Sequence, residues 1–263
     1  MRRQDVNAVL AAVAGTSILC YALIRPASPY YAPITDALPI IASLLAIIMC
    51  IRSYKDIAFS KNIRHSLGCF IIGLSLWCAA ETIWFIFENI LKIMLPFPSF
   101  ADALWLSGYP FLMAGTIFGL LAFRGLINLN TAYITGTIAI GLFAIFSWLL
   151  FIPIIKSSSI GIIEKSLDIA YPALDFILLF TTVAILSTIF KGLYTKPWFL
   201  LSAGLAMFAL SDISFSYLTW TGHYRVYRVS SILTDLGWII GYLLLAKGFY
   251  EMQAVASEKR KRH

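Results

Sequence analysis

Long apolar runs, separated by short polar connections, dominate the chain. Eight such runs cover approximately residues 6–24, 34–51, 67–93, 100–123, 131–155, 167–190, 198–220 and 229–249. Most approach the roughly 20 residues that a helix needs to cross a bilayer. The second is short and has Pro39 near its start. The pattern predicts an all-α polytopic membrane protein with about eight transmembrane helices.

Two stretches of this pattern, 73–109 and 204–242, resemble each other. In each, a Gly-Leu pair is followed by an acid, and later by an Asp, a Trp three residues on, and a Gly-Tyr pair. The matched residues are Glu81 with Asp212, Asp102 with Asp235, Trp105 with Trp238, and Tyr109 with Tyr242. Chance similarity between apolar helices is the alternative, but polar residues in register argue against it. Such internal similarity is typical of duplicated membrane folds.

The repeat predicts a single membrane domain built from two parallel four-helix units, about 6–124 and about 131–250, followed by a basic tail at 251–263. A four-helix unit returns the chain to its starting side. The two units should therefore be related by a pseudo-twofold axis along the membrane normal.

Composition and charge agree with membrane insertion. The 263 residues are 60% hydrophobic and 13% charged, which is unlike a soluble domain. The net charge of +7 does not indicate nucleic-acid binding, because the basic residues lie in short loops and at the tail. With the N-terminus inside, 14 of the 20 Lys and Arg residues fall on the cytoplasmic side. This bias predicts a multi-pass protein of the cell membrane with both termini cytoplasmic.

Acidic residues inside apolar runs are the strongest functional signal, because charges at bilayer depth usually face a bundle interior or a water-filled cavity. Helical spacing places Trp and Tyr on the same faces as these acids. The sequence predicts one outward-facing ligand-binding cavity formed by Glu81, Trp84, Glu88, Asp102, Trp105, Tyr109, Asp168, Tyr171, Asp175, Asp212, Asp235, Trp238 and Tyr242.

Two alternatives concern these same residues. The acids could make separate structural hydrogen bonds between helices, with no cavity between them. Aromatic residues near span ends could form an interfacial belt. This is the preferred interpretation for Tyr30, Tyr31, Trp148, Trp198, Tyr217 and Trp220.

The chemistry of the set favours a cationic or amphipathic small molecule, because aromatic faces and carboxylates both attract cations. The same acids would suit proton or hard-cation coupling. No His lies within a predicted span, the four Cys residues form no CxxC pair, and no GxSxG motif occurs. We therefore expect no disulfide, metal site, cofactor or catalytic residue, and an intramembrane enzyme is the third-ranked interpretation.

Three phrases carry a resemblance to a known class of protein region: PFPSFADALWLSGYPFLMAG at 96–115, LDIAYPALDFILL at 167–179 and TDLGWIIGYLLLAKGF at 234–249. They resemble the multi-spanning membrane sensor regions that precede diguanylate cyclase, phosphodiesterase or histidine kinase domains in prokaryotic signalling proteins. The likeness covers roughly 66–250. The matching positions are Pro98, Ser99, Asp102, Tyr109, Pro110, Asp168, Tyr171, Pro172, Asp175, Asp235, Gly237 and Trp238.

The resemblance implies an external sensing module. This chain ends where such proteins begin their output domain, so we expect signalling through a partner, in addition to contact with the lipid bilayer. A small-solute or ion transporter that uses the same cavity is the alternative function.

Overall fold

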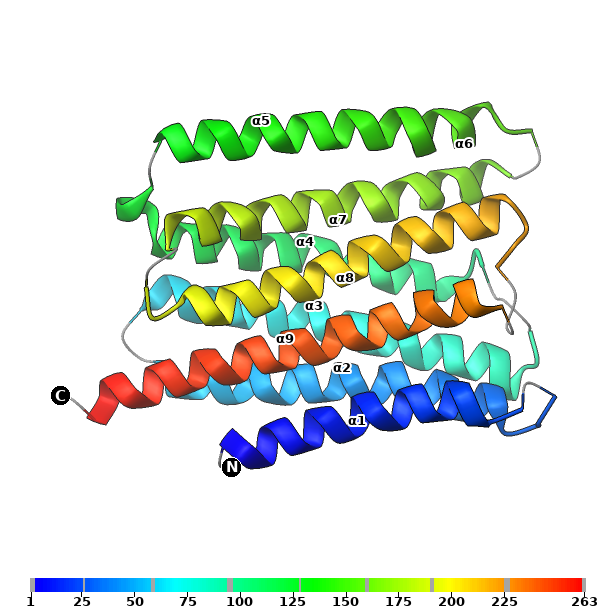
Figure 1. The fold of residues 1–263 in the computed structure, drawn as a ribbon, viewed down its shortest axis with the longest axis horizontal. Helices are drawn as coiled ribbons and strands as arrows, with labels where there is room; N and C mark the ends of the chain where they lie inside the picture. Colours follow the sequence, from blue (N-terminus) through cyan, green and yellow to red (C-terminus); the bar gives the residue numbers. More distant parts are fainter. Residues whose placement is uncertain are drawn as a thin grey trace.

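The computed structural model describes residues 3–25, 27–57, 60–93, 97–127, 129–158, 161–189, 192–224 and 228–261, and within them the chain is helical with no strand. In Figure 1 the helices lie side by side along the long axis of the molecule. The first unit contains α1 (Arg3–Leu23), α2 (Tyr31–Asp56), α3 (Lys61–Phe85) with a π-helical turn (Ile86–Ile90), and α4 (Phe100–Ala122).

The second unit follows a short 3-10 turn (Arg124–Leu126). It contains α5 (Leu129–Phe146), a π-helical turn (Ser147–Phe151), α6 (Ile152–Lys156), α7 (Ile162–Thr188), α8 (Thr195–Trp220) and α9 (Val229–Lys261). Eight helical segments of the described chain are long and apolar enough to cross a membrane. The prediction of an all-α polytopic membrane protein is therefore confirmed.

Two helices are longer than their apolar runs suggested. The second span, expected at 34–51, is a helix of 26 residues, since Pro39 is accommodated inside α2. The tail expected from residue 251 instead continues α9 to Lys261. Glu251 holds this extension in place, because it is 5% exposed and its Oε1 lies 3.0 Å from Lys196 Nζ and 2.8 Å from Lys247 Nζ.

Both termini lie at one end of the bundle, as an even number of spans requires (Figure 1). The connections between α1 and α2, α3 and α4, and α8 and α9 lie at the opposite end. With both termini cytoplasmic, the α8–α9 connection is predicted to lie on the outer side, and Arg225 in this connection lies outside the described residues.

Polar residues fix where several helices begin. Ser60 accepts a hydrogen bond from Ile63 N at the start of α3. At α4, Ser99 Oγ accepts from Ala101 N at 3.2 Å, while Ser99 N donates to Asp102 Oδ2 at 2.6 Å. These bonds satisfy backbone N–H groups that have no partner within the helix.

The closest helix pairs, α3–α4 and α8–α9, cross at matched glycines. A Cβ on Gly108 would lie 2.6 Å from Trp77 and 3.1 Å from Gly73 O. A Cβ on Gly241 would lie 2.8 Å from Phe208 and 3.2 Å from Gly204 O. These positions correspond in the two sequence repeats, so the duplicated residues make the same kind of contact twice. Small residues at such crossings allow the backbones to approach closely.

Contacts between the units also occur in matched pairs. Helix α2 packs on α9, and its counterpart α7 packs on α4. The core between them is formed by buried side chains of both units, including Phe70, Leu112, Trp198 and Phe249. Helix α5 lies at one edge of the bundle (Figure 1) and packs on α7. Many of its apolar side chains, including Ile134 and Ile140, are exposed, as lipid contact requires.

Candidate functional site

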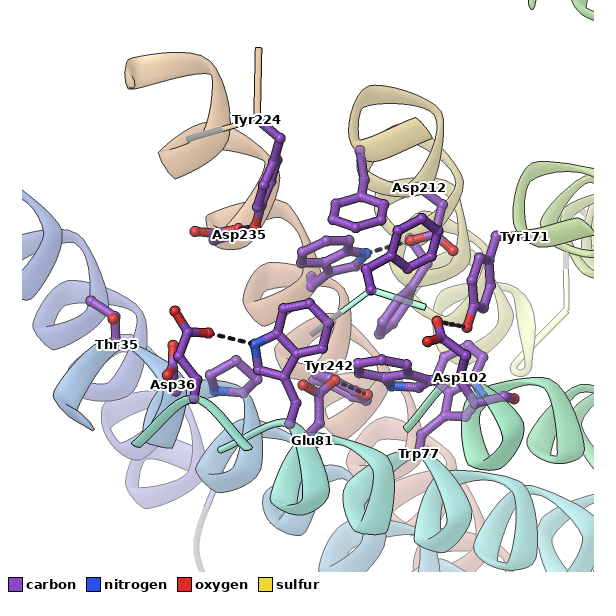
Figure 2. A pocket seen from close by; sticks show the side chains of 18 of the residues that line it. Thr35, Asp36, Trp77, Glu81, Asp102, Tyr171, Asp212, Tyr224, Asp235 and Tyr242 are labelled. Atoms are coloured by element: carbon purple, nitrogen blue, oxygen red, sulfur yellow. Dashed lines mark hydrogen bonds between the residues drawn. The ribbon is translucent and has the colours of Figure 1, made fainter. Parts of the chain in front are cut away.

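A cavity lies between the two units. Its empty volume, counted together with the solvent space at its open mouth, is about 1120 Å³. Tyr31 at the start of α2, Phe97 before α4 and Tyr224 before α9 line its mouth end, so it opens at the end opposite to the termini. Figure 2 shows acids from several helices around it. The described lining residues are Tyr21, Tyr31, Ala32, Thr35, Asp36, Pro39, Trp77, Glu81, Trp84, Glu88, Phe97, Asp102, Trp105, Tyr109, Tyr171, Phe208, Asp212, Phe215, Tyr224, Asp235, Trp238 and Tyr242.

Most of the predicted site residues meet in this cavity. Eleven of the thirteen line it: Glu81, Trp84, Glu88, Asp102, Trp105, Tyr109, Tyr171, Asp212, Asp235, Trp238 and Tyr242. The other two, Asp168 and Asp175, do not. Both are 1% exposed and lie behind the wall: Asp168 Oδ1 accepts from Thr219 Oγ1 at 3.3 Å, and Asp175 Oδ1 accepts from Tyr109 Oη at 2.8 Å.

The mouth contains two acids, Asp36 and Glu88, that each have one oxygen to which no described residue donates a hydrogen bond. Trp84 Nε1 donates to Glu88 Oε2 at 3.0 Å, and Asn89 Nδ2 donates to Asp36 Oδ2 at 2.7 Å. Glu88 and Asn89 belong to the π-helical turn that ends the α3 segment. Such turns often occur at functional sites, because the extra residue redirects the side chains that follow.

Deeper in the cavity, the matched acids Glu81 and Asp212 receive matched donors. Tyr242 Oη donates to Glu81 Oε1 at 2.9 Å, and the Trp105 indole also hydrogen bonds to Glu81. Trp238 Nε1 donates to Asp212 Oδ1 at 2.6 Å, and Tyr109 Oη approaches Asp212 Oδ2 at 3.3 Å. Each acid thus has the Trp of its own unit and the Tyr of the other unit as partners.

Asp235 and Asp102 have both oxygens occupied. Tyr224 Oη donates to Asp235 Oδ1 at 2.6 Å, and Tyr21 Oη lies 3.5 Å from Oδ2. Tyr171 Oη donates to Asp102 Oδ1 at 2.7 Å, and Oδ2 accepts from the backbone at the start of α4. Asp102 therefore has a clear structural role, since it anchors α4 and ties α4 to α7.

Tyr224 lies in the connection between α8 and α9. Burial raises the pKa of the Tyr224 phenol well above its usual range, and the negative charge of Asp235 is the second largest cause of this rise. The phenol therefore stays neutral and keeps donating to Asp235 through the physiological pH range.

Four aromatic rings close the deep end of the cavity. Trp77 and Phe208, which correspond in the repeats, meet with ring centroids 4.8 Å apart. Trp77 contacts Tyr109 at 5.3 Å, and Phe208 contacts Tyr242 at 4.7 Å. Residues that the sequence repeat pairs, Trp77 with Phe208 and Tyr109 with Tyr242, thus lie on either side of this contact.

The described cavity lining is acidic and aromatic. Six of the lining residues that the structure describes are Asp or Glu, and none of the described ones is Lys, Arg or His. Within the described residues, no group of three or more His, Cys, Asp or Glu side chains has a geometry that could hold a metal ion. The arrangement can attract a cation, but the acids are spread around the wall rather than gathered at one point.

Sequence reasoning missed several lining residues, among them Tyr21, Thr35, Phe97 and Tyr224. They come from α1, from the start of α2 and from loops, and no sequence motif connects them to the repeat. Asp36, an acid within the second apolar run, is a further lining residue outside the predicted set.

Two residues preferred for the interfacial belt are placed elsewhere. Tyr31 is 2% exposed and lines the cavity, with its ring packed edge-on against Tyr21 at 6.1 Å. Trp198 is fully buried against α4, where Gly119 leaves room for its ring. By contrast, Tyr30, Trp148 and Tyr217 are 68%, 71% and 52% exposed, as a belt position requires.

No family model matches the chain, and no curated protein or solved structure matches it significantly.

Proposed function

We propose that the cavity binds a small organic cation with an apolar or aromatic body, and that the protein acts as a membrane sensor that signals through a partner. The observation that carries the proposal is the lining, in which six acids and many aromatic rings surround open space, with no basic side chain among the lining residues that the structure describes. Cation–π attraction strengthens when the cation is desolvated, as it would be in this enclosed position.

Four partly exposed acids form the proposed cation-binding surface. Asp36 and Glu88 at the mouth each keep a free carboxylate oxygen. Glu81 and Asp212 lie deeper, where their Trp and Tyr partners orient them. A cation entering from the mouth would pass the first pair before reaching the second. In this proposal the termini are on the cytoplasmic side of the cell membrane, so the cavity faces outward.

The sensor interpretation also draws on the resemblance of the three sequence phrases to membrane sensor regions. The extension of α9 beyond the apolar part of the helix supports it too, since it offers a partner a helical segment continuous with the cavity wall. Trp238 and Tyr242 belong to the same helix. A movement of Trp238 and Tyr242 on ligand binding would therefore also move the C-terminal end of α9, because both ends belong to one helix.

Binding is tested directly with tetraphenylphosphonium, a permanent cation with four aromatic rings. Isothermal titration calorimetry on the purified protein in lipid nanodiscs should detect its binding. Triphenylphosphine oxide, which has similar rings but no net charge, should bind at least about tenfold more weakly, equivalent to about 1.4 kcal/mol. Equal affinity for the two probes, or no binding of either, would count against a cation site.

Matched variants locate the binding site. Glu81→Gln keeps the shape of the side chain but removes its charge, and should lower the affinity for tetraphenylphosphonium by about tenfold or more. Trp105→Phe should cost less, because an aromatic face remains. Glu164→Gln is the control, since Glu164 lies on α7 away from the cavity and accepts a bond from Gly161 N. An unchanged affinity in Glu81→Gln would place the binding elsewhere.

Transport is the second candidate, because transporters often place their site at the interface of two repeats. The cavity occupies this position here. Proteoliposomes separate the two functions. A transporter should accumulate or exchange labelled tetraphenylphosphonium faster than protein-free vesicles, whereas a sensor should bind it without moving it.

A further inference from the structure

Two acids from neighbouring helices meet behind the closed end of the cavity. The carboxyl groups of Asp175 on α7 and Asp212 on α8 are in hydrogen-bonding contact with each other. Tyr109 Oη on α4 lies 2.8 Å from Asp175 Oδ1 and 3.3 Å from Asp212 Oδ2. Asp175 is 1% exposed, and its Oδ2 is buried without a donor.

The contact between the two carboxyl groups requires one more proton than the neighbouring hydrogen-bond donors supply. The Trp238 indole donates its hydrogen bond to Asp212 Oδ1. The Tyr109 hydroxyl has only one hydrogen, which the two acids must share. Two carboxylates cannot hydrogen bond to each other unless one is protonated. Asp175 Oδ2 is buried without a donor, so Asp175 is the member of the pair that best accommodates the additional proton.

The surroundings provide no positive charge that could substitute for a proton. The titratable groups facing the pair are Tyr109 on α4, Tyr171 on α7, Glu81 on α3 and Tyr242 on α9. All of them are neutral or acidic. Within the part of the chain that the structure describes, neither Asp175 nor Asp212 forms an ion pair with a Lys, Arg or His side chain.

We propose that Asp175 and Asp212 form a proton-binding site, which holds one proton between α7 and α8 and exchanges it with the cavity through Asp212. Asp212 lines the cavity and Asp175 does not, so Asp212 is the side from which water can reach the proton. Loss of the proton would leave two negative charges on adjacent helices in a buried position. Proton binding therefore strengthens the contact between α7 and α8. This site does not depend on whether the cavity binds an organic cation.

Infrared spectroscopy of the ligand-free protein in nanodiscs tests the site. At neutral pH we expect the carbonyl stretch of a protonated carboxylic acid, shifted when the protein is produced with aspartate labelled at its side-chain carboxyl carbon. The band should lose intensity in Asp175→Asn and in Asp212→Asn, and remain unchanged in Glu164→Gln. The absence of any aspartate-derived protonated band in the wild-type protein would overturn the proposal. This outcome requires no variant to fold.

The pH dependence of stability provides a second measurement. The native state binds a proton that the unfolded state releases at neutral pH, so the midpoint of thermal unfolding should fall as pH rises through the range where the band disappears. In Asp175→Asn an uncharged amide replaces the protonated acid, and this part of the pH dependence should vanish. The proposal would be wrong if the band persisted unchanged in both Asn variants, or if the pH dependence of Asp175→Asn matched that of the wild-type protein.

Discussion

The hydroxyl of Tyr242 on α9 donates a hydrogen bond of 2.9 Å to Glu81 on α3. The counterpart of this contact in the sequence repeat is Tyr109 on α4, whose hydroxyl lies 3.3 Å from Asp212 on α8. Each tyrosine thus reaches the acid of the other four-helix unit. This crossed arrangement is what a pseudo-twofold axis between the units produces, and it makes the acids part of the interface as well as part of the cavity.

Removing either hydroxyl should destabilise the protein. Tyr242→Phe leaves Glu81 Oε1 without this donor, and Tyr109→Phe does the same for the Asp175–Asp212 pair. Each change should cost about 1–3 kcal/mol, because a buried acceptor loses its partner. The measurement is thermal unfolding in nanodiscs. Tyr30→Phe is the control, since Tyr30 is 68% exposed, and it should leave the transition unchanged. Equal behaviour of the three variants would mean that the crossed bonds contribute no stability.

The part of this site that sequence could predict is the part set by helical periodicity. The spacing of Trp77, Glu81, Trp84 and Glu88 placed them on one face of one helix, and all four line the cavity. The repeat paired Glu81 with Asp212, whose donors do correspond. Both inferences need only local geometry and internal similarity.

The sequence pattern could not predict which side chains of different helices come into contact. Asp168, Tyr171 and Asp175 share approximately one helix face, yet only Tyr171 reaches the cavity. The rotation of α7 against α4 and α8 decides this, and no single-helix pattern encodes it. Tyr21 and Tyr224 contact Asp235 from α1 and from the α8–α9 connection, and neither is one of the matched residues of the repeat.

The glycine crossings provide a test of the packing between α3 and α4 and between α8 and α9. Gly108→Ala and Gly241→Ala would each place a Cβ against an aromatic ring, at 2.6 Å from Trp77 and 2.8 Å from Phe208. We expect a loss of about 1–3 kcal/mol in each case, because the helices must move apart. The measurement is the denaturation midpoint in mixed detergent micelles.

Gly136→Ala on α5 is the matched control, since nothing lies within 4 Å of the added Cβ. Alanine has a higher helix propensity than glycine, so this variant should be neutral or stabilised by up to about 1 kcal/mol. If Gly108→Ala were as stable as Gly136→Ala, the close approach of α3 and α4 would be incorrect.

Membrane orientation can be tested by cysteine labelling in intact cells. Arg225 lies outside the described residues, so His223 in the same connection is the better reporter for the mouth end. A membrane-impermeant maleimide should modify His223→Cys from outside but should not modify Lys261→Cys at the end of α9. The parent protein, with its four free cysteines, sets the background. Labelling of position 261 in intact cells would reverse the orientation, and the cavity would then face the cytoplasm.

Cation binding should weaken as pH falls. Tetraphenylphosphonium carries no titratable group, so any pH dependence of its affinity originates in the protein. Protonation neutralises the carboxylates that face the cavity, and lowering the pH therefore removes the charge that attracts the cation. Calorimetric titrations at a series of pH values should show affinity that is highest in mildly alkaline buffer and falls steadily toward acid.

Tyr224 should not contribute to this profile. Burial and the charge of Asp235 raise the pKa of its phenol, so it remains a neutral donor as pH rises from neutral to mildly alkaline values. Tyr224→Phe removes no group that titrates in this range, but it removes the donor to Asp235, so any change in the curve of this variant reports on Asp235 rather than on the phenol. Glu81→Gln removes one titrating group from the cavity and should flatten the curve. A wild-type affinity independent of pH would show that the carboxylates do not contact the bound cation, and the acids would then serve only to join the helices.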